Sequence, residues 1–251
     1  LAVEVLHNFT LVHDDIMDQD SIRHGQDTVH EKWDDGVAIL TGDAMLSLAL
    51  KLINQSPKSS KQIEIFIDGL LAVCEGQALD KEFETDRSIN IEKYIKMIDL
   101  KTGYMIGLAS HIGAIAVDSI DKDTSESLRD YGRLIGRAFQ IQDDYLEIFS
   151  DSKGMGKSLQ SDILLGKKTF LMIKALQHDE KFVRDSLILA KSDFKKGIQK
   201  IREYITSSGI KEFTKREINN LINIADKKLS SLNIDNDKLL YFSDLIRKRG
   251  N

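Results

Sequence analysis

The sequence of 251 residues is poor in residues that interrupt helices or cross-link chains, since it has one proline, Pro57, and one cysteine, Cys74. A single cysteine excludes an internal disulfide, so a reducing compartment, the cytoplasm, is the expected location. Alternating strand patterns and Asn-Gly hairpin signals are scarce, whereas helical spacing of apolar residues recurs in nearly every segment. The sequence therefore predicts an all-α fold.

The chain also lacks a basic stripe and a long apolar run. Its net charge of −5 gives no indication of nucleic-acid binding. A membrane-spanning helix needs about 18 consecutive apolar residues. The longest candidate, residues 106–117, is shorter than that and contains His111. We therefore expect neither a nucleic-acid partner nor a membrane span.

Apolar spacing predicts helices over most of the chain. They cover approximately residues 2–20, 37–54, 61–82, 91–117, 125–149 and 169–178, with two or three amphipathic helices after these. Asn90 is the expected N-cap of the fourth helix, and the polar, glycine-rich residues 150–168 are expected to form a loop. Neither a repeat nor a linker divides the chain, so we predict one domain over residues 1–251. Because residue 2 is already in a helical pattern, we expect further N-terminal helices to precede it.

Two acidic clusters lie inside apolar helical stretches, at residues 14–18 (DDIMD) and 143–147 (DDYLE). Positions i and i+4 share one helix face, so each cluster presents two carboxylates that repel each other unless a cation lies between them. A lone acidic triplet is usually a solvated helix face, but apolar neighbours indicate little solvated surface here. Buried carboxylates should be paired or metal-bound. Mg²⁺ prefers oxygen ligands and usually carries phosphate oxygens, so the two clusters predict a diphosphate site.

The helix of the second cluster carries two glycines, Gly132 and Gly136, on nearly the same face as Phe139 and Asp143. Either these glycines leave a groove for an elongated apolar group, or they allow close packing of two helices.

Cations suited to the outer phosphate oxygens are also present. They are Arg23, Lys101, Lys157 and Lys167.

Several motifs in a fixed order carry a resemblance to a known family. They are residues 13–18 (HDDIMD), Arg23, 42–43 (GD), 76–80 (GQALD), 101–103 (KTG), 139–144 (FQIQDD), 156–157 (GK) and 166–169 (GKKT). This order resembles the trans-isoprenyl diphosphate synthases, or polyprenyl synthetases, and most of all those that make geranylgeranyl diphosphate. The resemblance implies an orthogonal helical bundle of the isoprenoid synthase type around a central cavity. It also implies a homodimer that condenses isopentenyl diphosphate with an allylic diphosphate.

The resemblance further implies a role for individual residues. Three Mg²⁺ ions are expected to be held by Asp14, Asp18 and Asp143, with Asp15, Asp144 and Glu147 as supporting acids. The residues expected to bind the diphosphate are Arg23, Lys101, Lys157 and Lys167. Thr102 and Gln140 are expected to orient dipoles towards the allylic cation and, with Lys101, to form the catalytic set. Phe139 is expected to contact the substrate.

Three features depart from the family pattern. His24 stands where a second arginine is usual, so the binding of isopentenyl diphosphate is in doubt or depends on pH. Glu147 replaces a closing aspartate, and the upstream Gly-Lys-x-x-Arg region has no counterpart. At the other end we expect the basic residues 247–249 to be a frayed, solvated tail rather than a flap over a diphosphate.

Product length gives two conflicting predictions. On an ideal helix Thr10 lies about 40° from Asp14 and Phe9 about 140° away, so geometry makes the small Thr10 the residue that lines the tunnel. The resemblance instead assigns the bulky Phe9 as the stop that is typical of C20 producers. We expect geranylgeranyl diphosphate as the product, with a farnesyl or longer-chain synthase as the alternative.

Two other classes of function compete with a prenyltransferase. A class I terpene cyclase usually replaces the second acidic cluster by another metal motif, and residues 139–144 argue against it. A non-catalytic partner of an active synthase tends to lose its acids, whereas this chain keeps them.

Overall fold

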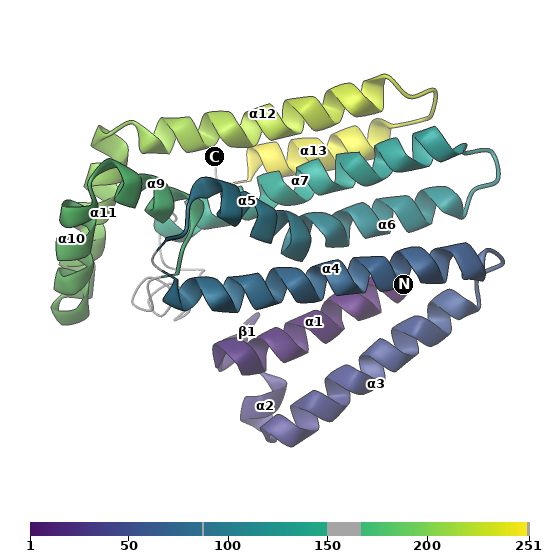
Figure 1. The fold of residues 1–251 in the computed structure, drawn as a ribbon, viewed down its shortest axis with the longest axis horizontal. Coiled ribbons are helices and arrows are strands. Elements are labelled where there is room, and N and C mark those ends of the chain that lie inside the picture. The colour runs from purple at the N-terminus through teal and green to yellow at the C-terminus, as the bar shows by residue number, and fades with distance from the viewer. Residues whose placement is uncertain (87, 150–166, 250–251) are drawn as a thin grey trace.

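A computed structural model describes residues 1–86, 88–149 and 167–249, and these residues form an α-helical protein (Figure 1). The helices of the first half are α1 (Ala2–Asp18), α2 (Val29–Lys32), α3 (Asp35–Asn54), α4 (Ser59–Thr85), α5 (Ile91–Ile98), the π-helical turn η1 (Asp99–Gly103) and α6 (Tyr104–Ile115). Those of the second half are α7 (Lys122–Phe149), α9 (Phe170–His178), α10 (Glu180–Ser192), α11 (Phe194–Ser207), α12 (Ile210–Ser230) and α13 (Asp237–Lys248). The all-α prediction is confirmed.

The only sheet in the described part of the chain is a small antiparallel hairpin of β1 (Ile22–Arg23) and β2 (Gln26–Asp27). Its two turn residues, His24 and Gly25, both have positive φ angles, of 52° and 77°. Such a two-residue turn matches the twist of a hairpin, and histidine is among the residues that tolerate this conformation. The hairpin follows α1 directly and carries Arg23 back towards the helix end.

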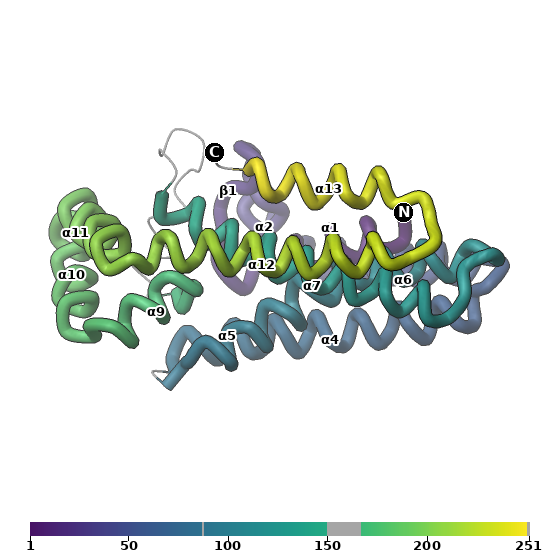
Figure 2. Tube along the Cα trace, turned by 90° about the horizontal axis from the view of Figure 1, so that it is seen from above, coloured from purple at the N-terminus to yellow at the C-terminus, as the bar shows by residue number. Residues whose placement is uncertain are grey.

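Long helices define the shape of the molecule. In both views α4, α6, α7 and α12 run along its long axis, and α10 and α11 stand at one end (Figures 1 and 2). Helix α6 packs on α7, α1 packs on α3, and α12 packs on α7. Their buried side chains form a large apolar cluster around α7, α9, α11 and α12 and a smaller one among α1, α3, α4 and α6.

Within the described residues four helices follow His178, so the prediction of two or three was too low. The extra boundaries come from single aspartates, because Asp179 and Asp193 each accept a hydrogen bond from the backbone N–H three residues later, at 2.9 and 3.1 Å. These N-caps start α10 and α11 without the glycine or proline that marks a helix break in a sequence. The expected cap at Asn90 is confirmed, since its Oδ1 accepts from the Lys93 N–H at 2.9 Å.

The predicted helix over residues 91–117 contains a wide π-helical turn, η1. Asp99, the first residue of this turn, accepts a hydrogen bond from Arg133 and lies 3.5 Å from Nε of Arg137, both on α7. Helix α4 crosses the same turn at Gly76, where an added Cβ would lie 2.4 Å from the backbone nitrogen of Lys101. Single π-helical turns often occur at functional sites, and this one brings Lys101 and Thr102 between α4 and α7.

Gly132 and Gly136 allow close helix packing, so the groove interpretation is wrong. A Cβ at Gly136 would lie 2.7 Å from Cα of Gly103 and 2.9 Å from the carbonyl oxygen of Thr102. A Cβ at Gly132 would likewise lie 2.7 Å from the carbonyl oxygen of Ile106. The face of α7 that carries these glycines is therefore covered by η1 and α6.

Helix α3 is the one helix in the described ranges that is long and apolar enough to cross a membrane, with 20 residues and a mean hydropathy of 1.7. This is weak evidence for a membrane span, because it rests on length and composition only. In the structure the helix packs on α1 and α4.

Replacing Gly136 with alanine should destabilise the protein by about 1–3 kcal/mol, because the new methyl group meets backbone atoms that cannot move aside. Gly113→Ala is the matched control: this glycine lies inside α6 and an added Cβ meets nothing within 4 Å. The control should stabilise the helix by about 0.5–1 kcal/mol. Urea unfolding measures both changes, and equal stabilities for the two variants would contradict the close packing of α7 on η1.

Candidate functional site

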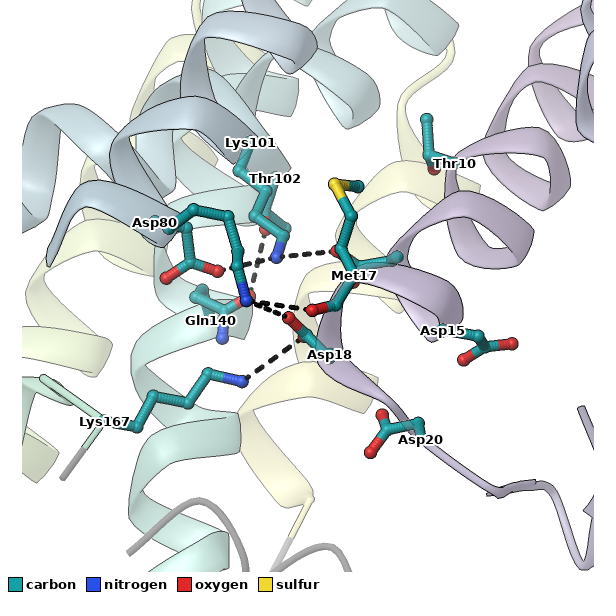
Figure 3. Close-up of polar contacts among 12 residues, drawn as sticks. Thr10, Asp15, Met17, Asp18, Asp20, Asp80, Lys101, Thr102, Gln140 and Lys167 are labelled. Carbon is teal, nitrogen blue, oxygen red and sulfur yellow. Dashed lines mark hydrogen bonds and ion pairs between the residues drawn. The ribbon is translucent and has the colours of Figure 1, made fainter. Parts of the chain in front are cut away.

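The carboxyl end of α1 presents the first acidic cluster to three lysines from other elements. Asp14 Oδ1 lies 3.4 Å from Lys101 Nζ, which comes from η1. Asp18 lies 3.3 Å from Nζ of Lys81 on α4 and 3.9 Å from Nζ of Lys167, which precedes α9. Figure 3 shows Asp18 and Lys167 facing each other across the site. The structure thus brings Asp14, Asp18, Lys101 and Lys167 together, and the binding roles assigned to them stay predictions.

Lys101 is held between two aspartates. Its Nζ donates to Asp80 Oδ2 at 2.8 Å in addition to its contact with Asp14. Burial alone would lower the pKa of Lys101, but the charges of Asp80 and Asp14 outweigh it and the pKa is raised. Burial raises the pKa of Asp14 in turn, and Lys101 opposes that rise. Lys101 therefore stays protonated, which suits a role in binding an anion.

Thr102 and Gln140 contact each other, and the role that the resemblance assigns to them towards an allylic cation stays a prediction. The Thr102 hydroxyl donates to Gln140 Oε1 at 3.0 Å, which joins η1 to α7 beside Lys101 (Figure 3). Sequence reasoning assigned no role to Gln77, which lies one helical turn before Asp80 on α4. Both polar atoms of its amide are buried and make no hydrogen bond within the described residues. A buried amide without partners is destabilising, so Gln77 is available to a polar group of a ligand.

Arg23 and Asp15 form their own ion pair beside this cluster. Nε and Nη2 of Arg23 both lie 2.6 Å from Asp15 Oδ1. Asp15 is 4% exposed, and Figure 3 shows it directed away from Lys101. The structure therefore pairs Arg23 with Asp15, the supporting acid, rather than with Asp14 or Asp18.

In the second cluster Asp143 contacts a cation from the end of the described chain. Arg249 Nη1 lies 2.5 Å from Asp143 Oδ1, and the guanidinium carbon lies 4.6 Å from the centre of the Phe139 ring. Burial raises the pKa of Asp143, and Arg249 opposes that rise. The expectation of a frayed tail is wrong for Arg249, because a carboxylate and an aromatic face both attract its guanidinium group. A metal bound by Asp143 would compete with Arg249 for Oδ1.

Asp144, the next acid, is enclosed by protein. Its Oδ2 accepts from the Tyr94 hydroxyl at 2.5 Å and from the Phe170 N–H at 2.7 Å, and its Oδ1 accepts from Gln140 Nε2 at 3.4 Å. Burial raises the pKa of Asp144 to about 7 although all three hydrogen bonds lower it. Sequence reasoning missed Tyr94, since nothing in its own helix pattern points to a distant acid.

The remaining predicted residues divide into those outside the described chain and those on α1. Lys157 lies outside the described residues, as do residues 156 and 166 of the motifs. Phe9 is buried in the smaller apolar cluster, and its ring meets that of His13 with centroids 4.7 Å apart. Thr10 is half-buried and its hydroxyl donates to the His7 carbonyl at 2.7 Å. Phe9 is thus a core residue, and its assigned role as a chain-length stop stays a prediction.

The donor atoms fit a hard divalent cation, because the acidic clusters offer carboxylate oxygens and no thiolate or imidazole. Within the described residues no group of three or more such side chains is close enough to hold an ion unaided. Mg²⁺ commonly keeps water and takes phosphate oxygens beside one or two carboxylates. Binding at Asp14, Asp18 and Asp143 would accordingly depend on a phosphate ligand.

Comparison with known proteins decides the family. A family model described as Polyprenyl synthetase matches residues 1–205. The chain belongs to the polyprenyl synthetase family. Among solved structures of the family, geranylgeranyl pyrophosphate synthetase from Pyrococcus horikoshii is similar with a TM-score of 0.90 and 30% identity, over 99% of this chain and 78% of that one. This similarity confirms the predicted bundle of the isoprenoid synthase type.

Relatives within the polyprenyl synthetase family are similar over much of the chain. It is 41% identical over 213 residues to the geranylgeranyl diphosphate synthase of Saccharolobus solfataricus, which covers 81% of this chain and 64% of that protein. It is also 41% identical over 190 residues to a short chain isoprenyl diphosphate synthase of Methanothermobacter thermautotrophicus. That alignment covers 74% of this chain and 58% of the relative. The matched part is thus about three fifths of each relative.

The raised pKa of Asp144 predicts a pH-dependent stability. The Asp144 carboxyl group binds its proton more tightly in the folded protein than in the unfolded chain. The free energy of unfolding therefore falls as the pH rises from 3.8 to about 7, and above that pH Asp144 causes no further change in it. Asp144→Asn removes this contribution, on the order of 1.4 kcal/mol per unit of pKa shift. Urea unfolding at pH 5 and pH 8 in EDTA should show the variant gaining stability relative to the wild type at the higher pH. A constant difference between the two proteins would contradict the shift.

Proposed function

We propose that the protein is a prenyltransferase that condenses isopentenyl diphosphate with an allylic diphosphate to give a longer trans-prenyl diphosphate. The observation that carries this proposal is the position of Lys101, which lies between Asp14 and Asp80 and next to the Thr102–Gln140 pair. A charged lysine, paired carboxylates and an oriented amide in one place suit a reaction in which a diphosphate leaves and a carbon cation forms. Family membership supports the same reaction.

The acidic and the basic residues of the site would bind different parts of the substrate complex. Three Mg²⁺ ions would be held by Asp14, Asp18 and Asp143. When bound, these ions would offset the negative charge of the leaving diphosphate. Lys101 and Lys167 lie near the acids and would bind outer phosphate oxygens, as we propose also for Arg23 and for Lys157. These contacts favour the charge that develops as the diphosphate departs.

The reaction breaks an allylic C–O bond and a C–H bond, and it forms a C–C bond and an O–H bond. The bond between the allylic carbon and the diphosphate oxygen breaks, and the diphosphate leaves with the electron pair. The double bond of isopentenyl diphosphate attacks the allylic cation and forms the new carbon–carbon bond. The attack leaves a new cation, and the departing diphosphate takes a proton from the neighbouring carbon so that a double bond forms again. The products are a longer prenyl diphosphate and protonated diphosphate. The oxygen dipoles of Thr102 and Gln140, with the unpaired amide of Gln77, would stabilise the cation.

We propose geranylgeranyl diphosphate as the main product. Phe9, on the helix that carries Asp14, fills the apolar cluster among α1, α3, α4 and α6, so its removal should open space for a longer chain. Thr10, one residue further along the same helix, is small and half-buried.

Incubation with Mg²⁺, isopentenyl diphosphate and a panel of allylic diphosphates tests the reaction and its product. We expect a C20 product that disappears in EDTA, and Phe9→Ala should yield longer chains. Phe66→Ala is the matched control, because Phe66 is fully buried in the same cluster but lies on α4. Failure to form any condensation product would favour a non-catalytic partner subunit, and a cyclic hydrocarbon would favour a terpene cyclase. An unchanged product length in Phe9→Ala would exclude Phe9 as the stop.

We also infer that the protein forms a homodimer through α3 and α4. Helix α3 exposes Val37, Ile39, Leu40 and Leu48, and the adjacent α4 exposes Ile67 and Leu71. Exposed apolar surface of this kind is typical of an interface between proteins.

Light scattering should give twice the monomer mass for the wild type and the monomer mass for the double variant Leu40→Lys with Leu71→Lys, since lysine would have to be desolvated in the interface. Ile188→Lys is the control, because Ile188 is 66% exposed on α10, compared with 69% for Leu40 and 62% for Leu71. A monomeric wild type, or a dimer that survives both charges, would refute this interface.

A further inference from the structure

Asp144 joins three segments of the protein through one carboxyl group. Its hydrogen-bond donors are the Tyr94 hydroxyl from α5, Gln140 from the previous turn of α7, and the N–H of Phe170 at the start of α9. The Asp144 residue is 5% exposed. With its oxygens turned to these donors, Asp144 acts as a connection between helices.

Two of those donors belong to segments that build the proposed diphosphate site. Gln140 also accepts the hydrogen bond of Thr102, at 3.0 Å, next to Lys101. Phe170 follows Lys167 by three residues, and Lys167 lies 3.9 Å from Asp18. A shift of the Asp144 carboxyl group would therefore move the dipole pair on one side and the start of α9 on the other.

Tyr94 provides the shortest of the three hydrogen bonds, at 2.5 Å, compared with 2.7 Å for Phe170 and 3.4 Å for Gln140. Tyr94 is 2% exposed, and its ring packs near that of Phe170 with centroids 6.0 Å apart. Its hydroxyl therefore has a fixed direction, because the ring that carries it is packed on the same helix start that Asp144 binds.

We propose that Tyr94 is a positioning residue of the diphosphate site. Its hydroxyl holds the Asp144 carboxyl group, which in turn orients Gln140 towards Thr102 and fixes the start of α9 that follows Lys167. This role deepens the proposed function and rests on it. The Tyr94 hydroxyl contacts Asp144, and Tyr94 acts on the site through that carboxyl group.

A second buried tyrosine offers a matched control. The Tyr131 hydroxyl donates to the Leu239 carbonyl at 2.7 Å and lies 3.1 Å from the Ser243 hydroxyl. Tyr131 is 1% exposed and joins α7 to α13. Tyr94→Phe and Tyr131→Phe each remove one buried hydroxyl and keep the ring, so both report the loss of a buried hydrogen bond.

Three measurements separate positioning from general stability. Hydrogen exchange of the peptide 167–175 measures how firmly the start of α9 is held. Calorimetry with Mg²⁺ and inorganic pyrophosphate measures the affinity of the anion site. Steady-state kinetics separates an effect on kcat from one on KM. We expect Tyr94→Phe to exchange this peptide faster and to bind pyrophosphate several-fold more weakly. Its kcat should fall roughly tenfold, which corresponds to about 1.4 kcal/mol of lost transition-state stabilisation. Tyr131→Phe should lose similar thermal stability and keep all three properties.

The outcomes distinguish this role from the proposed reaction. If the wild type condenses its substrates and Tyr94→Phe matches Tyr131→Phe in kcat, exchange and pyrophosphate binding, the positioning role is overturned and the reaction stands. If the wild type forms no product but Tyr94→Phe still weakens pyrophosphate binding and loosens residues 167–175, the positioning role stands and the proposed reaction fails.

Discussion

Carboxylates that are partly or fully removed from water between packed helices require opposite charge or hydrogen bonds. This requirement constrains which elements pack against one another around the site. Asp14 and Asp80 share Lys101, Asp18 lies near Lys81 and Lys167, and Asp143 pairs with Arg249. Removing one partner of such a pair leaves an uncompensated charge in a site of low polarity. The acids therefore constrain the approach of α4, η1, α9 and α13 to the two helices that carry them.

Close backbone contact makes this arrangement of charges possible. Gly76 lets α4 reach the backbone of η1, and Gly136 lets α7 reach it from the other side. The turn held between them carries Lys101 towards Asp14 and Thr102 towards Gln140. A side chain at either glycine would separate the lysine from the acids, so packing and electrostatics at this point depend on each other.

Much of the fold and part of the site followed from local patterns in the sequence. The predicted helices and the N-cap at Asn90 required only periodicity and capping chemistry. The approach of Asp14 to Lys101 agrees with the order of motifs that carries the family resemblance. Other features depend on contacts between residues that are distant in the chain. The pairing of Arg249 with Asp143, the bond from Tyr94 to Asp144 and the salt bridge from Lys101 to Asp80 are of this kind. The two interpretations of Gly132 and Gly136 were equally compatible with their spacing, and only the position of α6 and η1 distinguishes them.

The two acidic clusters show which properties depend on sequence and which depend on tertiary structure. That Asp14 and Asp18 share one face, as Asp143 and Glu147 do, is determined by sequence alone, because the geometry of one helical turn is local. Which cation meets which acid was decided only by tertiary structure, because desolvation and charge pairing depend on elements that other parts of the chain bring close. Asp143 and Asp144 are neighbours of the same type, yet one pairs with an arginine and the other accepts hydrogen bonds in the interior. Their different directions on α7 expose them to different neighbours, and those neighbours determine what each carboxylate does.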